Sequence, residues 1–235
     1  NAGQVIPGFE AADYDSRGWA DIHVPAHIQM EGYGAPQYAN VQYPWDGYQA
    51  VEIGEIPQEY NPVASYIKTF FVPAQMVGKR VFISFQGAES CIAVWLNGRY
   101  VGFSSDSFTP SEFELTDYLV EGENKLACRV ERWSAGSWLE DQDFWRFGGI
   151  HRSIHLIHTP DIHVRDYAVR TLPASVGDYK DFILQIDPQF SVYRGMTGKG
   201  YVLQGVLKDA SGKEVATLKG DVEDILDLEH KASRM

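Results

Sequence analysis

Three acidic residues in one short stretch carry the side chains best suited to chemistry. Glu140, Asp141 and Asp143 lie among three tryptophans in the run RWSAGSWLEDQDFWRFGGIHR, which covers residues 132–152. Carboxylates bind sugar hydroxyls through paired hydrogen bonds, and the C–H faces of a sugar ring pack on aromatic rings, so the stretch has the composition of a saccharide site. A surface loop held by an ion pair between Arg146 and Glu140 or Asp141 would have the same composition, and the residue types alone do not separate the two interpretations.

Asp141 and Asp143 also have a spacing that invites comparison with a catalytic pair. In an extended segment the two side chains point to one side, roughly 6.6 Å apart. This gap is close to the separation of about 5 to 5.5 Å between the two carboxyl groups of a retaining glycosidase. Both would nevertheless approach a substrate from the same wall, and neighbouring buried carboxylates raise each other's pKa. A binding or structural role fits better, so we predict no catalytic residue in this chain.

The histidines His151, His155 and His158 suggest a metal site by their number. On an extended strand His151 and His155 would share a face but lie roughly 13 Å apart, whereas His158 would point to the other face. That spread is too large for a single ion. We therefore expect histidines that are solvated or hydrogen-bonded in the core.

The charge of the chain limits its partners. The 32 acidic and 20 basic residues give a formal net charge of −12, which is repelled by nucleic-acid phosphates and by anionic membrane surfaces. No run of residues has the apolar length of a membrane span. We expect a soluble chain in the cytoplasm that binds neither nucleic acid nor membrane.

Cysteine usage leaves the compartment open. Cys91 and Cys128 both lie in apolar, β-like runs, without the spacing of metal ligands. Buried free thiols are expected, although a disulfide would be possible if the two runs were neighbouring strands.

Short β-branched and aromatic segments separated by turn residues run through the first two thirds of the chain. Asn97-Gly98 stands between CIAVWL and RYVGF and predicts a hairpin, because both residues tolerate positive φ. No segment before residue 160 has a sustained helical period. We therefore predict an all-β fold, with an antiparallel jelly-roll β-sandwich over residues 1–160. Its predicted strands are Ser65–Val72, Arg80–Phe85, Cys91–Leu96, Tyr100–Phe103, Lys125–Val130 and Ile150–Ile157.

The sequence becomes less aromatic at Thr159-Pro160, where a second β-unit begins. Residues 161–235 predict an incomplete immunoglobulin-like β-sandwich, because about 75 residues fall short of the roughly 100 that such a domain has. An incomplete sandwich has unpaired edges, so we expect this unit to be partly disordered or supported by a partner. Its predicted strands are Ile162–Thr171, Phe182–Ile186, Tyr201–Lys208 and Glu214–Leu218.

Two segments of the chain resemble the N-terminal sugar-binding domain of family 2 β-galactosidases. One is VPAHIQMEGYGAPQYANVQYPWD at residues 24–46, and the other covers residues 82–160 and includes WLNGRYVGF and EDQDFWRFGGIHR. The resemblance extends over residues 15–160 as an ordered series of uncommon strings. β-Glucuronidases are similar in the sandwich and in the NG-x-x-x-G hairpin, whereas the EDQDFW string favours the galactosidases. Residues 161–235 lie where that family has its first immunoglobulin-like domain.

The resemblance implies roles for two residues. Asn40 matches the Asn of the family's Y-x-N-V-x-Y-P string, and Asp143 matches the second Asp of its E-D-Q-D-x-W string. In the family both residues contact galactose, and the residue matching Asp143 is also a ligand of Na⁺. From the residues alone, structural roles are favoured for both: Asn40 in a turn near Pro44, and Asp143 as a backbone cap or as a partner of Arg146.

The resemblance also implies what this chain lacks. The family's catalytic glutamates and remaining sodium ligands belong to a (β/α)₈ barrel, and no β–α alternation occurs in this sequence. For the full-length enzyme it implies a homo-oligomer and allows Mg²⁺ as a further cofactor.

Three functional hypotheses follow. The first is the N-terminal sugar-binding region of a retaining β-galactosidase, which binds β-galactoside saccharides together with the absent barrel. The alternative is a stand-alone, non-catalytic carbohydrate-binding module, and the third is a structural domain for oligomer assembly.

Overall fold

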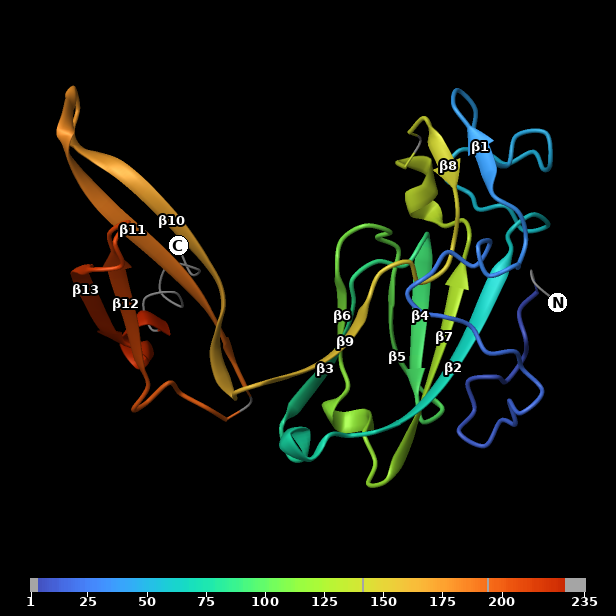
Figure 1. Cartoon of the computed structure of the whole chain (residues 1–235), viewed down its shortest axis with the longest axis horizontal. Helices are drawn as coiled ribbons and strands as arrows, with labels where there is room; N and C mark the ends of the chain where they lie inside the picture. The colour runs from blue at the N-terminus through green and yellow to red at the C-terminus, as the bar shows by residue number, and fades with distance from the viewer. Residues whose placement is uncertain (1–3, 141, 194, 227–235) are drawn as a thin grey trace. The chain divides into compact units, whose positions relative to one another are not determined.

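The computed structural model describes residues 4–140, 142–193 and 195–226 of the chain. The chain forms two compact units, Asn1–His158 and Thr159–Met235, which we describe one at a time (Figure 1). Both consist of antiparallel strands, which confirms the all-β prediction. Among the described residues, no helix has the length and apolar character needed to cross a membrane.

The first unit contains two sheets and a separate ribbon of two strands. The four-stranded sheet has the order β2-β7-β4-β5, and the three-stranded sheet has the order β6-β3-β9. The ribbon pairs β1 with β8. Short 3₁₀ helices lie at Ala74–Met76, Thr116–Tyr118 and Ala135–Trp138. The strands are β1 (Gln37–Ala39), β2 (Val63–Phe71), β3 (Arg80–Phe85), β4 (Cys91–Leu96), β5 (Arg99–Ser104), β6 (Ser111–Glu114), β7 (Glu123–Glu131), β8 (Phe144–Arg146) and β9 (Ile154–Thr159).

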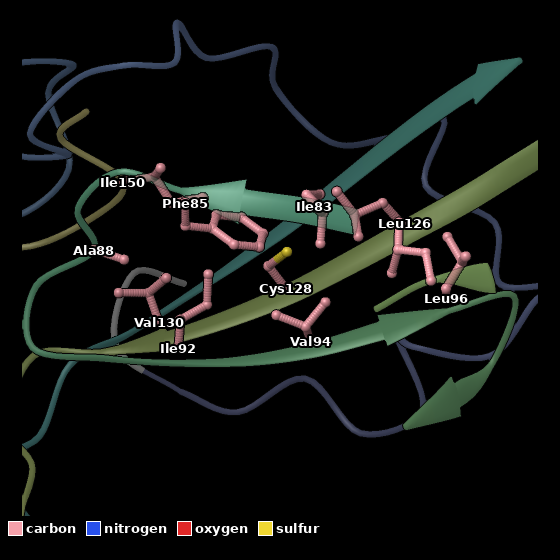
Figure 2. Packing of buried hydrophobic residues seen from close by; sticks show 11 residues of the cluster. Ile83, Phe85, Ala88, Ile92, Val94, Leu96, Leu126, Cys128, Val130 and Ile150 are labelled. Atoms are coloured by element: carbon pink, nitrogen blue, oxygen red, sulfur yellow. The ribbon is translucent and has the colours of Figure 1, made fainter. Parts of the chain in front are cut away.

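Apolar side chains from both sheets pack into one core, so the two sheets form a β-sandwich. Phe85 of β3, together with Val94 and Leu96 of β4, is fully buried. These side chains point toward one another between the sheets in Figure 2. Burying such large apolar side chains is the main source of stability of this unit. The core cluster is Ile83, Phe85, Ala88, Ile92, Val94, Leu96, Leu115, Leu126, Cys128, Val130 and Ile150.

The predicted hairpin at Asn97-Gly98 is confirmed. It connects β4 to β5, and the φ angles of Asn97 and Gly98 are 53° and 81°, both positive as a type I′ turn requires. The Asn97 side chain also donates a hydrogen bond of 2.9 Å to Oδ1 of Asn124. The turn is thereby tied to the start of β7.

The cysteines are buried and free, as predicted. Their strands β4 and β7 are indeed neighbours, but the register places Cys128 opposite Val94, and Cys91 opposite Glu131. The two thiols therefore do not face each other across the sheet.

One predicted strand begins later than expected. The segment Ile150–Ile157 enters regular pairing only at Ile154, where β9 starts. The residues before it run between two other segments: Gly149 exchanges backbone hydrogen bonds of 3.0 and 3.1 Å with Glu89, and Ile28 donates one of 3.0 Å to Gly148. This irregular junction brings three distant parts of the sequence together.

The second unit consists of two hairpins. β10 (Ile162–Ser175) pairs with β11 (Asp178–Val192), β12 (Val202–Lys208) pairs with β13 (Glu214–Asp221), and residues 222–226 are helical. Many of their apolar side chains are exposed, among them Tyr167 and Phe182. The expected disorder or partner support of this unit stays a prediction.

Candidate functional site

The β1–β8 ribbon brings the two residues singled out from the sequence to the same end of one element. Tyr38 of β1 is opposite Trp145 of β8, and β1 lies beside β8 in Figure 1. Asn40 follows the last residue of β1, and Asp143 precedes the first residue of β8. Tyr38 and Trp145 are cross-strand neighbours on one face of the ribbon, and Tyr38 also contacts Asp143. Asn40 and Asp143 are exposed residues in the bends that flank the two strands. We call these four residues the ribbon face.

The ribbon face is open to solvent and contains both polar and aromatic groups. All four of its residues are exposed. The Tyr38 hydroxyl donates a hydrogen bond of 2.6 Å to Oδ1 of Asp143, and this bond raises the pKa of Tyr38. The rings of Tyr38 and Trp145 are 5.5 Å apart and inclined at 45°. A carboxylate has about four acceptor positions, so Asp143 retains capacity for further donors.

The opposite face of the ribbon is turned into the protein. Ala39 and Arg146 are almost fully buried. Gln37 donates a hydrogen bond to the carbonyl oxygen of Pro44 and accepts one of 3.0 Å from the Tyr60 hydroxyl. The strand alternation thus separates an anchored face from an exposed one.

Two buried arginines hold the ribbon and the loop that leads into it. Nη2 of Arg132 donates to the carbonyl oxygens of Ala35 at 3.2 Å and of Arg146 at 3.0 Å, and so connects both strands. Arg146 donates to the carbonyl oxygens of Glu140 and Gln142, in the loop that precedes Asp143. These main-chain acceptors fix the direction from which the chain enters the ribbon face.

The hydrogen bond from Arg146 to Glu140 goes to the backbone oxygen and not to the side-chain carboxylate that we expected. The Glu140 carboxylate accepts a hydrogen bond of 2.9 Å from Ser107, while Arg146 binds the Glu140 backbone. Asp141, the other expected partner, lies outside the described residues. Arg146 anchors the loop through main-chain oxygens, which the residue types alone could not indicate.

Buried carboxyl groups lie beneath the ribbon, close to these arginines. Glu89 is 6% exposed, and burial first, then the charge of Glu140, raises its pKa to about 7, while Arg146 and Arg132 act in the opposite direction. Burial also raises the pKa of Glu140. Asp143 differs from both because its side chain is exposed.

The tryptophans of the acidic stretch do not form one surface with its carboxylates. Trp133 is buried, and Trp138 is half-buried and donates to the carbonyl oxygen of Glu55 at 2.6 Å. Trp145 is 55% exposed and belongs to the ribbon face. Because two of the three rings serve packing, the composition of the stretch overstates its aromatic surface.

Of the aromatic residues near Asn40 in the sequence, some are packed in the interior and others are exposed. Trp45 is buried and stacks on Tyr43, with ring centroids 5.1 Å apart. Tyr33 lines an apolar pocket of about 310 Å³ together with Trp19 and Tyr66. Of these aromatic residues, Tyr38 is the one on the ribbon face.

The histidine prediction needs one correction. His155 and His158 are exposed on β9, in agreement with solvated side chains. His151 differs because it is half-buried, and its ring nitrogens make no hydrogen bond of normal geometry among the described residues, although the Gly149 backbone lies near enough to act on the ring as an acceptor. Its neighbours are His27 and Glu89, which the spacing of the three C-terminal histidines did not reveal.

Comparison with known proteins finds one family and many relatives. Residues 9–160 match the family described as "Glycosyl hydrolases family 2, sugar binding domain". A β-galactosidase of Halalkalibacterium halodurans is 56% identical over 162 residues, which cover 69% of this chain and 16% of that protein. A β-galactosidase of Streptococcus thermophilus is 46% identical over 213 residues, which cover 85% of this chain and 21% of that protein. The chain thus spans between 16% and 33% of the curated relatives that it matches.

Solved structures of glycosidases share the fold. A β-glycosidase from Bacteroides vulgatus matches with a TM-score of 0.66 and 21% identity over 92% of this chain and 26% of that chain. A β-glucuronidase from Bacteroides uniformis matches with a TM-score of 0.69 and 18% identity over 94% of this chain and 24% of that chain. At these identities the likeness concerns the fold alone.

The Tyr38–Asp143 hydrogen bond gives a pH-dependent prediction. Replacing Asp143→Asn removes the charged acceptor, so the pKa of Tyr38 should fall toward its ordinary value of about 10. Because the pKa of Tyr38 is higher in the folded than in the unfolded state, the hydrogen bond contributes its full stabilisation of the fold below the unfolded pKa. This contribution disappears as the pH rises through the folded pKa. Carbon-13 NMR titration of labelled tyrosines, with Tyr38 assigned through Tyr38→Phe, measures the shift. The control Asp21→Asn, at an exposed position, should leave the Tyr38 midpoint unchanged, and equal midpoints in wild type and Asp143→Asn would show that the bond is absent in solution.

Arg146 gives a prediction about the loop before Asp143. A lysine has one nitrogen on a flexible stem, so Arg146→Lys cannot reproduce a planar fork with two main-chain acceptors. We expect the free energy of unfolding to fall by about 1–3 kcal/mol, and the amides of residues 140–143 to exchange faster with deuterium. The control Arg17→Lys concerns an arginine that is 91% exposed, and should change neither quantity. Unchanged exchange in Arg146→Lys would contradict the anchoring role.

Proposed function

Because this chain belongs to glycosyl hydrolase family 2, with residues 9–160 matching its sugar-binding domain, we propose that it is the N-terminal sugar-binding region of a retaining β-galactosidase. The ribbon face contributes contacts to galactose, and a (β/α)₈ barrel in a longer polypeptide completes the active site. The share of the relatives that the chain spans, 16% to 33%, supports this division of labour.

The observation that carries the proposal is that Asn40 and Asp143 are both exposed and flank the two paired strands at the same end of the ribbon. The Asn40 amide both donates and accepts hydrogen bonds, whereas the ionised Asp143 carboxylate only accepts, so together they suit neighbouring sugar hydroxyls. The Tyr38 hydroxyl holds one oxygen of Asp143 in place. The exposed Trp145 ring adds an apolar surface for the C–H side of a pyranose.

Asp143 is also our proposed ligand for Na⁺. Its exposed carboxylate offers hard oxygen atoms, which alkali and alkaline-earth cations prefer. One of these oxygens, Oδ1, accepts a hydrogen bond from Tyr38. A sodium ion held there would coordinate a sugar hydroxyl, and the remaining ligands would come from the barrel. Mg²⁺ belongs to the same proposal for the longer enzyme, with no ligand assigned in this chain.

The chain by itself is proposed to be inactive. A retaining glycosidase places two carboxyl groups about 5 to 5.5 Å apart, one on each side of the scissile bond. The ribbon face contains a single carboxylate, that of Asp143. The acid and the nucleophile are therefore assigned to the barrel, while Asn40 and Asp143 bind the substrate.

A second candidate function is a stand-alone carbohydrate-binding module. The exposed rings of Tyr38 and Trp145, 5.5 Å apart, favour it, because such a pair can bind a sugar without help from a barrel. The two proposals differ in the affinity that they predict for the isolated chain.

A chimeric enzyme tests the first proposal. The aligned part of this chain replaces the 213 matched residues of the Streptococcus thermophilus β-galactosidase, and hydrolysis of a nitrophenyl β-galactoside is measured. We expect an active chimera in which Asp143→Ala lowers kcat/KM by about 10- to 100-fold, the loss expected when a hydrogen bond to a charged group is removed. Asp21→Ala, at an exposed position away from the ribbon, should change kcat/KM little. Equal kcat/KM in Asp143→Ala and the parent chimera would refute the proposed role.

Titration of the isolated chain with galactose separates the two candidates. A site that needs the barrel should bind no tighter than about 1 mM, because a few exposed hydrogen bonds gain little against water. Changes in the amide NMR spectrum on addition of galactose measure the affinity. Tighter binding that is lost in Trp145→Ala would favour the stand-alone module.

A further inference from the structure

Three segments that are far apart in the sequence meet at the irregular junction before β9. Ala26 donates a backbone hydrogen bond of 2.9 Å to Ile150, and Glu89 and Gly149 exchange a pair of them. Residues 148–150 therefore make backbone hydrogen bonds to both of the other segments, through the Glu89–Gly149 bridge and through Ala26 and Ile28. His27 lies between Ala26 and Ile28, and His151 directly follows Ile150.

The side chains of these three residues converge. One ligand atom from each of His27, Glu89 and His151 lies within 4.8 Å of the other two. The two imidazole rings are nearly parallel, with centroids 5.3 Å apart and an interplanar angle of 10°. Phe147 stacks on the other side of His27 at 4.5 Å, so the rings are held in a packed column.

Three of the four ring nitrogens of this cluster are poorly satisfied. Nδ1 of His27 and both Nδ1 and Nε2 of His151 are buried, and none has a hydrogen-bond partner of normal geometry among the described residues. A buried polar group left unsatisfied costs about 1–3 kcal/mol. Three such atoms lie beside the carboxyl group of Glu89, which is 6% exposed, and the Gly149 backbone is the polar group near His151.

We propose that His27, Glu89 and His151 bind a divalent transition-metal ion, with Zn²⁺ as the ion of best fit. Two imidazole nitrogens and one carboxylate oxygen suit zinc, whereas Mg²⁺ and Ca²⁺ prefer oxygen ligands throughout. Ligands at 2.0–2.1 Å from a tetrahedral zinc ion are roughly 3.3 Å apart, so rotations of the side chains close the gap from the observed spacing. Three protein ligands leave a fourth position for water.

The surroundings limit the strength of the site. The guanidinium groups of Arg132 and Arg146 act on Glu89 as positive charges and oppose a cation, whereas the Glu140 carboxylate favours it. Backbone packing works in favour of the site, because Gly87 leaves the room that the His151 ring fills: a Cβ at position 87 would lie 2.7 Å from Nε2 of His151. The close fit beside Gly87 restricts the position of the His151 ring.

The ion would connect the three segments more firmly than their few hydrogen bonds do. His27 lies ten residues before β1 and His151 five residues after β8, so an ion there would join the segments that lead into and out of the ribbon. Its role is structural, and it depends neither on the sugar-binding proposal nor on the Na⁺ assigned to Asp143.

Equilibrium dialysis against Zn²⁺ tests the proposal. The 235-residue chain is stripped with a chelator, dialysed against buffered zinc, and its metal content is measured by mass spectrometry. We expect one zinc ion per chain with a Kd in the micromolar range or tighter, and a melting temperature that rises with zinc concentration. With Co²⁺ in place of zinc, the visible absorption bands of a tetrahedral site should appear. A wild-type chain that takes up no zinc at about 100 µM free ion would overturn the proposal.

Variants locate the ion. His151→Phe keeps an aromatic ring in the column but removes the nitrogens, and should weaken zinc binding by at least about 100-fold. Glu89→Gln is an independent variant of similar shape and should weaken zinc binding as well. Circular dichroism shows whether each variant is folded, and the test can be read from either variant if the other does not fold. His155→Ala removes an exposed histidine of β9 and should keep full uptake and the thermal shift. Equal binding by wild type and a folded His151→Phe, or loss in His155→Ala, would place the ion elsewhere and refute the site.

Discussion

The buried guanidinium group of Arg132 is the constraint on which the ribbon depends. A ribbon of three residues on each strand is too short to be stable by itself. Arg132 is 6% exposed and donates to the backbone on both sides of the ribbon, at Ala35 and at Arg146. Because a buried cation without acceptors is costly, these two carbonyl groups have to be where the guanidinium group can reach them. The backbone of β1 and the backbone of β8 are thereby fixed with respect to the sandwich.

Alternation along the fixed ribbon then decides which side chains face solvent. Ala39 and Arg146 are turned inward, so their neighbours Asn40 and Trp145 have to be outward. The sandwich contains the hydrophobic core, whereas the ribbon carries exposed polar and aromatic side chains. The two are joined by arginine side chains that bind main-chain oxygens. The outward residues of such a ribbon can vary without a change in the core.

How much could be predicted from the sequence depends on how local each signal is. The strands β3 and β4 were predicted with their observed bounds, and the Asn97-Gly98 turn was predicted as well, because periodicity and turn chemistry lie within a few residues. β1 and β8 are three residues long, carry no readable period, and pair across about a hundred positions. Asn40 and Asp143 came from the family resemblance, whereas the hydrogen bond from Tyr38 depends on a pairing that no local pattern contains.

The ribbon face and the histidine cluster are two ends of one antiparallel arrangement. Backbone hydrogen bonds join Ala26 to Ile150 and Ile28 to Gly148, and pairing resumes at Gln37 and Arg146 after the turns and bends of residues 28–34. His27 is 124 positions from His151, so the spacing of neighbouring histidines could not reveal the cluster. Since the same two segments carry both sites, whatever restrains them at the histidine end also reduces the freedom of Asn40 and Asp143 at the other end. The pairing of the two segments therefore matters more to the candidate site than any residue on its exposed face.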